Sequence, residues 1–338
     1  IIAGPENYYE GFTSKCSELG EMLGYPVFAD GASQLRCGNH NKNAVVVNYD
    51  AFVRSENFFK KYKPDLIIHF GRTITSKHLD QYLEQCSAPR FMINEFGDWF
   101  DPSNKSLSAF ASKPVRFCEK MLFHLTKSGF SRKDLHWLKK FNELDNSAES
   151  IKKRYINKLP FPSESRIVSE LFKLLPDNCN LMISNSMPVR DIDYFLSKSE
   201  KNITLFNNRG ASGIDGITST ALGIAAISKQ PTFLITGDLA FYHDLNGLLS
   251  SMKYKIPLVV IVINNNGGGI FEMLPISSYG KVFKDNFITP HDLNFAHFVK
   301  GYNGDYDVIK SWDHFFSAFK KGLTRKKLTL LEFKTNAV

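Results

Sequence analysis

The sequence predicts an α/β protein built from two doubly wound parallel-sheet domains with helices on both faces. Short apolar runs rich in β-branched residues, typical of buried strands, alternate with helical patterns along the chain. A polar segment interrupts this alternation near the middle of the chain, and the alternation then resumes. The length of 338 residues, of which 43% are hydrophobic, suits two globular domains of ordinary size.

The first predicted domain spans residues 1–150. Its apolar runs predict strands at the opening residues and at 25–29, 44–48, 66–70 and 90–94. Its helical patterns cover residues 8–23 and 77–86. Between residues 130 and 162, charged and small polar residues dominate and a Leu-Pro-Phe-Pro run closes the segment. We therefore place the domain boundary near residue 150.

The second predicted domain spans residues 151–338 and repeats the alternation. Strands are predicted at 181–184, 203–206, 232–236, 258–263, 306–309 and 329–333. Helices are predicted at 163–175, 189–198, 291–301 and 312–323, and further helical runs lie on either side of the strand at 232–236. The segment 274–290 is predicted to be a loop.

Two strand ends of the second domain carry polar side chains and glycines. The strand at 232–236 ends in Gly237-Asp238-Leu239, and the strand at 258–263 opens into a run of three asparagines, three glycines, Ile270 and Phe271. These ends are roughly 26 residues apart, the length of one strand–helix–strand crossover. Both are therefore expected at the same edge of a parallel sheet.

Oxygen ligands gathered at such an edge predict a site for a hard cation and a diphosphate. The Asp238 carboxylate, the Asn265 side-chain oxygen and the Gly267 carbonyl would supply three of about six oxygens around Mg²⁺. A helix starting near Phe241 would point its amino end at the phosphates. The competing interpretations are a Gly-Asp turn in which Asp238 caps the next helix, and asparagines that only form a turn.

Composition narrows the class of protein further. The formal net charge is +8, but the cations are dispersed and form no stripe with interleaved aromatics, so no nucleic-acid partner is expected. No window of 18 apolar residues predicts a membrane span. The five cysteines form no C-x-x-C pair, which favours a reducing, cytoplasmic location. The chain opens on Ile1 without a visible targeting peptide, and we expect further sequence upstream.

Several longer strings resemble the thiamine-diphosphate-dependent enzymes, and among them the 2-succinyl-5-enolpyruvyl-6-hydroxy-3-cyclohexene-1-carboxylate (SEPHCHC) synthases of menaquinone biosynthesis. The resemblance covers essentially the whole chain and is weaker in the first half. Its motifs are Asn185-Ser186-x-x-x-Arg190, the string NRGASGIDG from Asn208 to Gly216, Gly237-Asp238-Leu239 with Asp244-Leu245-Asn246, and Asn264 to Phe271 followed by Leu274-Pro275.

The resemblance implies a domain composition and an activity. This chain resembles the middle and diphosphate-binding domains of the family, without the amino-terminal pyrimidine-binding domain and its cofactor-activating glutamate. That domain would come from upstream sequence or from another chain. The family decarboxylates 2-oxoglutarate and adds the succinyl unit to isochorismate, using thiamine diphosphate and Mg²⁺ or Mn²⁺. Its site lies between subunits, which implies a homodimer or homotetramer.

The resemblance also assigns roles to residues of this sequence. It makes Asp238, Asn265 and Gly267 the metal ligands. The substrate positions would be Ser186, Arg190, Arg209 and Lys77, with His78 standing where the family has an arginine. The remaining cofactor-binding positions would be Gly237, Leu239, Gly268, the cofactor-bending Ile214, and the cavity walls Ile270 and Phe271. The competing interpretation is core packing for each apolar residue, a surface ion pair for each arginine, and a solvent-exposed side chain for Lys77.

Two other functions stay open from the sequence. One is another thiamine-diphosphate enzyme, such as an acetolactate-synthase-like carboligase, which would not need Arg190 and Arg209 together. The other is an inactive diphosphate-binding remnant or regulatory module. Nucleotide-binding loops are disfavoured, because the segment 71–78 lacks the glycine and hydroxyl residue of a phosphate loop, and no G-x-G-x-x-G string is present.

Overall fold

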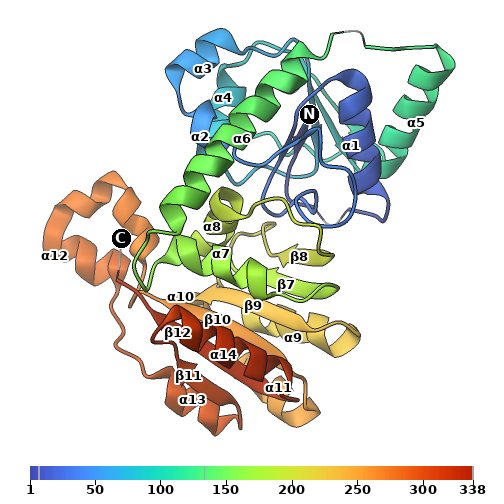
Figure 1. The fold of residues 1–338 in the computed structure, drawn as a ribbon. Coiled ribbons are helices and arrows are strands. Elements are labelled where there is room, and N and C mark those ends of the chain that lie inside the picture. The colour runs from blue at the N-terminus through green and yellow to red at the C-terminus, as the bar shows by residue number, and fades with distance from the viewer. Residues whose placement is uncertain (7, 133, 337–338) are drawn as a thin grey trace. The chain divides into compact units, whose positions relative to one another are not determined.

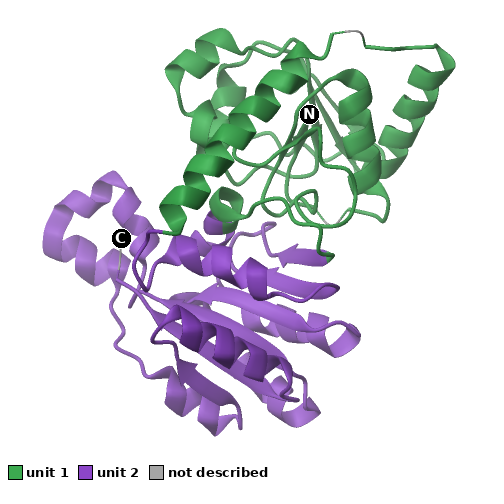
Figure 2. Ribbon diagram, viewed as in Figure 1, with its two compact units in different colours: residues 1–157, 192–202 green, residues 158–191, 203–338 purple. Residues whose placement is uncertain are grey.

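The computed structural model describes residues 1–6, 8–132 and 134–336, and the chain divides into two compact units (Figures 1 and 2). The first unit comprises residues 1–157 and 192–202, and the second comprises residues 158–191 and 203–338. Each unit contains a six-stranded parallel sheet with helices on both faces, as the sequence predicts. The expected boundary near residue 150 falls inside helix α6, and the chain leaves the first unit just after that helix ends.

The first unit has the strand order β3-β2-β1-β4-β5-β6. One face of the sheet is covered by α1 and α5, which lie side by side, and the other by α2, α3, α4 and α6 (Figure 1). The strands are β1 (Ile2–Ala3), β2 (Val27–Ala29), β3 (Val45–Val46), β4 (Ile67–Phe70), β5 (Arg90–Asn94) and β6 (Ser108–Ala111). The helices are α1 (Phe12–Leu23), α2 (Asp50–Val53), α3 (Glu56–Lys61), α4 (Lys77–Gln85), α5 (Pro114–Lys127) and α6 (His136–Ile156).

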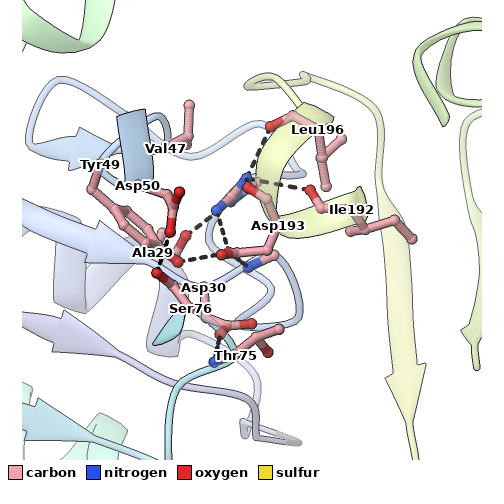
Figure 3. Close-up of polar contacts among 12 residues, drawn as sticks. Ala29, Asp30, Val47, Tyr49, Asp50, Thr75, Ser76, Ile192, Asp193 and Leu196 are labelled. Carbon is pink, nitrogen blue, oxygen red and sulfur yellow. Dashed lines mark hydrogen bonds and ion pairs between the residues drawn. The ribbon is translucent and has the colours of Figure 1, made fainter. Parts of the chain in front are cut away.

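A buried polar cluster holds the segment 192–202 within the first unit. Arg36 donates from Nη2 to Asp193 Oδ1 at 2.7 Å, and the Tyr49 hydroxyl donates to the same oxygen at 2.6 Å (Figure 3). The Arg36 guanidinium also donates to the main-chain carbonyls of Ala29, Asp193 and Leu196. Burial and the neighbouring Asp30 carboxylate raise the pKa of Asp193 to about 7, against the opposing effect of Arg36.

The second unit has the strand order β11-β12-β10-β9-β7-β8. Its strands are β7 (Cys179–Ile183), β8 (Ile203–Asn207), β9 (Thr232–Gly237), β10 (Leu258–Asn264), β11 (Asp305–Val308) and β12 (Leu328–Lys334). Its helices are α7 (Glu164–Leu174), α9 (Ile217–Ile227), α10 (Asp238–His243), α11 (Leu248–Tyr254), α12 (Gly280–Phe283), α13 (Phe295–Gly301) and α14 (Trp312–Leu323), and α8 (Met187–Phe195) begins in this unit. Shorter helical turns are η1 (Leu245–Gly247), η2 (Gly269–Met273), η3 (Pro275–Tyr279) and η4 (Lys284–Ile288).

Apolar side chains of both faces form the core of the second unit. One face packs α9, α10, α11 and α13 against β9, β10 and β12. On the other face, Phe319 of α14 stacks on Phe233 of β9 with ring centroids 5.2 Å apart, and Phe315 contacts Phe333 of β12 at 4.9 Å. Aromatic pairs of this kind add to the free energy that burial alone provides. No helix among the described residues has an apolar stretch long enough to cross a membrane.

Several predicted element boundaries were wrong, for local reasons. The first helix begins at Phe12, because Gly11 adopts a left-handed conformation (φ 87°) that precedes it. The helix predicted from residue 291 begins at Phe295, where the Asn294 side chain accepts a hydrogen bond from the Ala296 N–H. The predicted loop 274–290 contains η3, α12 and η4. The helix expected near Phe241 begins at Asp238.

Candidate functional site

A cavity of about 310 Å³ opens at the carboxyl edge of β7, β8, β9 and β10 in the second unit. Within the sheet, β8 lies on one side of β7 and β9 lies on the other. The direction in which successive strands are added therefore reverses at β7. Crevices at such a reversal are where open α/β sheets bind ligands. Every residue that the sequence predicts for the site, except Lys77, lines this cavity: Ser186, Arg190, Arg209, Ile214, Gly237, Asp238, Leu239, Asn265, Gly267, Gly268, Ile270 and Phe271.

Asp238 joins the two predicted strand ends. Strands β9 and β10 pair in parallel with Gly237 beside Ile263, which confirms that both ends emerge at one edge. The Asp238 side chain is 2% exposed and accepts a hydrogen bond from the Leu239 N–H at 2.7 Å and from the Gly267 N–H at 2.9 Å. The carboxylate therefore both binds the backbone of its own helix and fixes the start of the glycine run.

The three asparagines after β10 have different contacts. Asn264 is buried and donates to Glu332 Oε1 of β12 at 2.6 Å. Asn266 has a left-handed backbone (φ 63°), and its side-chain oxygen accepts the His291 and Asp292 N–H groups at 3.1 and 2.9 Å. Of the three, Asn265 lines the cavity. Of the three side-chain amides, that of Asn265 is therefore the one that a ligand in the cavity can reach.

Glycine is required at position 267. Its φ is 139°, and a Cβ placed there would lie 2.1 Å from the main-chain oxygen of Ile288. The neighbouring Gly268 N–H donates to that same oxygen at 2.7 Å. The Gly267 carbonyl accepts the Gly269 N–H at 3.0 Å, and its second lone pair is left for another partner.

These donors suit a hard cation that also binds phosphate. A carboxylate, a side-chain amide oxygen and a main-chain carbonyl are the oxygen ligands that Mg²⁺ prefers. Within the described part of the chain, no group of three or more His, Cys, Asp or Glu side chains is arranged to hold a metal. A cation held by the three oxygens of Asp238, Asn265 and Gly267 would take its remaining ligands from phosphate oxygens or water, which is how Mg²⁺ is usually bound.

Two arginines, Arg190 and Arg209, also line the cavity. Ser186 follows β7 with a left-handed backbone (φ 70°), and Arg190 donates from Nη1 to the Ser186 carbonyl at 2.6 Å. The Asn185 side chain donates to the Gly213 carbonyl at 2.7 Å and so holds the loop that carries Arg209 and Ile214. Guanidinium groups beside an apolar wall are suited to orient a carboxylate-bearing ligand.

Lys77 belongs to the first unit, where it is the exposed first residue of α4. The preceding Ser76 caps this helix by accepting the Leu79 N–H at 3.1 Å, and it donates to Asp50 (Figure 3). His78, where the resemblance implies that the family has an arginine, places Nδ1 3.2 Å from the same Asp50 oxygen. Asp50 thus fixes the start of the helix that carries Lys77.

Two polar residues of the site were missed by the sequence analysis. The Nε2 atom of His291 lies 3.2 Å from Asp238 Oδ2. In the sequence, a long segment that includes the predicted loop 274–290 separates His291 from β10. Glu164, the first residue of α7, lines the cavity. Burial raises the pKa of Glu164, and the Asp238 carboxylate also raises it, while hydrogen bonds with Thr335 and Asn265 lower it. Neither residue adjoins a strand end in sequence, so the pattern that identified Asp238 gave no signal for them.

Comparisons with known proteins agree with this geometry. Residues 1–183 match the family described as "Middle domain of thiamine pyrophosphate", and residues 194–333 match "Thiamine pyrophosphate enzyme, C-terminal TPP binding domain". Among solved structures, a thiamine diphosphate-dependent 4-hydroxybenzoylformate decarboxylase of Rhodococcus jostii RHA1 is similar with a TM-score of 0.62 and 15% identity, over 96% of this chain and 59% of that one. At this identity the likeness concerns the fold.

Curated relatives extend the likeness over the whole chain. The SEPHCHC synthase of Bacillus cytotoxicus is 38% identical over 99% of this chain and 56% of its own length. That of Listeria innocua is 38% identical over 94% and 54%, and that of Geobacillus kaustophilus is 36% identical over 99% and 57%. The chain thus spans about half the length of the curated relatives it matches.

Proposed function

This chain belongs to the thiamine pyrophosphate-dependent enzymes, and from that premise we propose that it forms the middle and diphosphate-binding domains of a SEPHCHC synthase. The whole enzyme, a transferase of menaquinone biosynthesis, would decarboxylate 2-oxoglutarate and add the succinyl unit to isochorismate. The observation that carries the proposal is the single cavity in which Asp238, Asn265 and Gly267 meet Arg190 and Arg209.

The proposed role of this chain is to bind and to orient. Asp238, Asn265 and Gly267 would hold Mg²⁺ or Mn²⁺, which anchors a diphosphate. Bound thiamine diphosphate supplies the carbon nucleophile and the electron sink that decarboxylation of a 2-oxo acid requires. The side chains of Ile214 and Phe271 would exclude water from the part of the cavity next to the cofactor.

Carboxylate binding is the second proposed role. Both proposed substrates carry carboxylates, which arginine binds through two parallel hydrogen bonds. Arg190 and Arg209 lie at the cavity, and Arg190 is held by its contact with the Ser186 carbonyl. We assign these residues to substrate orientation, which lowers the barrier by fixing the reacting groups in place. Lys77, in the first unit, is assigned to the same class of substrate contact.

The rest of the enzyme is also part of the proposal. A pyrimidine-binding domain, with the glutamate that activates the cofactor, would come from upstream sequence or from another chain. The chain's span of about half of its curated relatives supports this assignment. We further propose that the enzyme acts in the cytoplasm as a homodimer or homotetramer, as the family resemblance implies.

Calorimetric titration tests the site separately from catalysis. Thiamine diphosphate is titrated into the chain in the presence of Mg²⁺ and then in the presence of a chelator. Binding that depends on the metal supports the proposal. Because the pyrimidine half of the cofactor is assigned to another domain, the titration is repeated with the natural full-length protein, and the absence of metal-dependent binding there overturns the proposal. With the natural full-length protein, turnover of 2-oxoglutarate with isochorismate supports the named activity. Turnover of pyruvate alone would assign a different carboligase reaction to the same site.

A further inference from the structure

We propose that Asn185 is a positioning residue for the two arginines of the cavity, because its side chain holds the loop that carries Arg209 and the next residue holds Arg190. The inference rests on the function proposed above, since it presupposes that both arginines bind substrate carboxylates. Asn185 follows strand β7, is 2% exposed and lines the cavity. It therefore lies where the chain passes from the end of β7 into helix α8.

The Asn185 side chain bridges two points of the loop between β8 and α9. Its Nδ2 donates to the Gly213 carbonyl at 2.7 Å and to the Asn208 carbonyl at 3.3 Å. An amide nitrogen carries two hydrogens, so one side chain can supply both bonds. Both partners are carbonyl oxygens, which only accept, so the amide oxygen cannot take the place of the nitrogen. The two ends of the segment 208–213 are thus bound to the same buried nitrogen.

Arg209 lies inside this bridged segment. Its N–H donates to the Asn207 side-chain oxygen at 3.1 Å, and its carbonyl accepts from the Ser212 hydroxyl at 3.1 Å. Residues 210–213 are exposed to solvent, so packing contributes little to the position of this part of the loop. The hydrogen bonds from Asn185 are therefore expected to fix the loop and, with it, the place of the Arg209 guanidinium.

The residue next to Asn185 holds the second arginine. Arg190 donates from Nη1 to the Ser186 carbonyl at 2.6 Å. Ser186 has a left-handed backbone (φ 70°), which residues other than glycine rarely adopt and which the surrounding structure must maintain. One strand end thus sets Arg190 through a main-chain carbonyl and Arg209 through a side-chain amide. Such a fixed arrangement is what the orientation of carboxylate substrates requires.

Variants at position 185 remove the bridge. Asn185→Ala removes both hydrogen bonds, and Asn185→Asp keeps the shape of the side chain but has no N–H to donate to the two carbonyls. Asn180→Ala is the matched control, because Asn180 Nδ2 also donates twice, to the hydroxyls of Ser228 at 2.7 Å and Thr232 at 3.2 Å. Asn180 is likewise buried and belongs to β7, but it is not among the residues that line the cavity.

The first readout is trypsin cleavage after Arg209 in the natural full-length protein without ligands, identified by mass spectrometry. Cleavage of a loop in a folded protein follows the fraction of molecules in which the loop is open. We expect both position-185 variants to be cleaved there about 10- to 30-fold faster than the wild type, and Asn180→Ala to be cleaved at the wild-type rate. Because Asn185→Asp leaves no cavity, the test does not depend on whether the alanine variant folds.

The second readout is the kinetics of the same proteins. We expect both position-185 variants to raise the KM for 2-oxoglutarate or isochorismate by about 10- to 100-fold. Metal-dependent affinity for thiamine diphosphate should change much less, because the proposed metal ligands follow β9 and β10. In an Arg209→Ala background, replacing Asn185 should have little further effect on KM, since it acts through that arginine. A general loss of stability would not depend on Arg209.

Each result supports or overturns the inference. Wild-type rates of cleavage after Arg209 in both position-185 variants overturn it, and so does an equal acceleration in Asn180→Ala. Faster cleavage with a normal KM overturns the positioning role, as does an undiminished effect of replacing Asn185 in the Arg209→Ala background. A wild-type protein that turns over neither substrate refutes the proposed function, and the cleavage experiment then still decides whether Asn185 holds the loop.

Discussion

Replacing Asp238 with asparagine tests the proposed metal site with little change in shape. The carboxylate is 2% exposed, and each of its two oxygens accepts a main-chain N–H, from Leu239 and from Gly267. Asparagine has one side-chain oxygen, so one of these N–H groups would face an NH₂ group instead of an acceptor. A buried donor without a partner costs about 1–3 kcal/mol, and we expect the free energy of unfolding without ligand to fall by that amount.

The effect on metal binding is expected to be larger. Asp238 is the anionic member of the proposed ligand set, since Asn265 and Gly267 offer neutral oxygens. Two unit charges about 4 Å apart interact by about 4 kcal/mol at the effective dielectric constant near a protein surface, and about 1.4 kcal/mol is a factor of ten in affinity. We expect Asp238→Asn to weaken Mn²⁺ binding with thiamine diphosphate by about 100- to 1,000-fold.

Calorimetry in Mn²⁺ measures the affinity, and urea denaturation in a chelator measures the loss of stability. His291→Gln is the matched control, because His291 touches the same carboxylate at 3.2 Å and is not a proposed ligand. Removing a partner of a metal ligand typically costs about 10- to 100-fold in affinity. Glutamine can still donate a hydrogen bond to Asp238, so this control should lose less metal affinity than Asp238→Asn does. A folded Asp238→Asn protein with unchanged metal-dependent cofactor affinity would refute the assignment of Asp238.

Three further predictions use other parts of the molecule. Arg209→Ala should raise the concentration of 2-oxoglutarate or isochorismate needed for half-maximal rate and leave thiamine diphosphate affinity unchanged; a loss of cofactor affinity in calorimetry contradicts the assignment. Gly267→Ala should lower the free energy of unfolding by about 1–3 kcal/mol, because its Cβ meets the Ile288 carbonyl at 2.1 Å, whereas Gly223→Ala, whose Cβ meets nothing within 4 Å, should not. Burial, and to a lesser extent the Arg90 charge, lowers the pKa of His69 from 6.5 to about 4. The unfolded chain therefore binds a proton at a higher pH than the folded protein does, and the free energy of unfolding should fall by about 3 kcal/mol as the pH is lowered from about 6.5 to 4. Denaturation at several pH values should show this fall in the wild type and a smaller one in His69→Gln, and equal falls would contradict it.

The sequence predicted the central strands well because their pattern is continuous. β9 and β10 are apolar runs rich in β-branched and aromatic residues. A strand that is buried on both faces is almost always of this composition, so its sequence identifies it. β6 was not predicted, since the side chains of Ser108–Ala111 are only partly buried. α6 was not predicted either, because a long helix with few buried residues, such as Leu138 and Phe141, has the composition of a polar linker.

The site was predictable to the extent that its residues follow strands directly. Asp238 and Asn265 were identified because parallel strands bring their carboxyl ends to one edge. His291 and Glu164 reach the same place through packing between distant segments, which no local spacing encodes. The separate contacts of Asn264 and Asn266 were likewise hidden, because the neighbouring strand and loop decide which asparagine remains for the cavity.

A glutamate in the cavity raises the question of whether it activates the cofactor, a role that the sequence analysis assigned to a domain outside this chain. The contacts of Glu164 argue against that role. Its carboxylate already accepts a hydrogen bond from the Thr335 hydroxyl at 2.8 Å, and burial together with the carboxylate of Asp238, a proposed metal ligand, raises its pKa. An activating glutamate must instead reach the pyrimidine ring and exchange a proton with it. Glu164→Gln tests the activating role, because a glutamine cannot exchange that proton. Retained activity of this variant in the natural full-length protein excludes the activating role, and a collapse of activity with normal Mn²⁺ affinity assigns Glu164 to the cofactor ring.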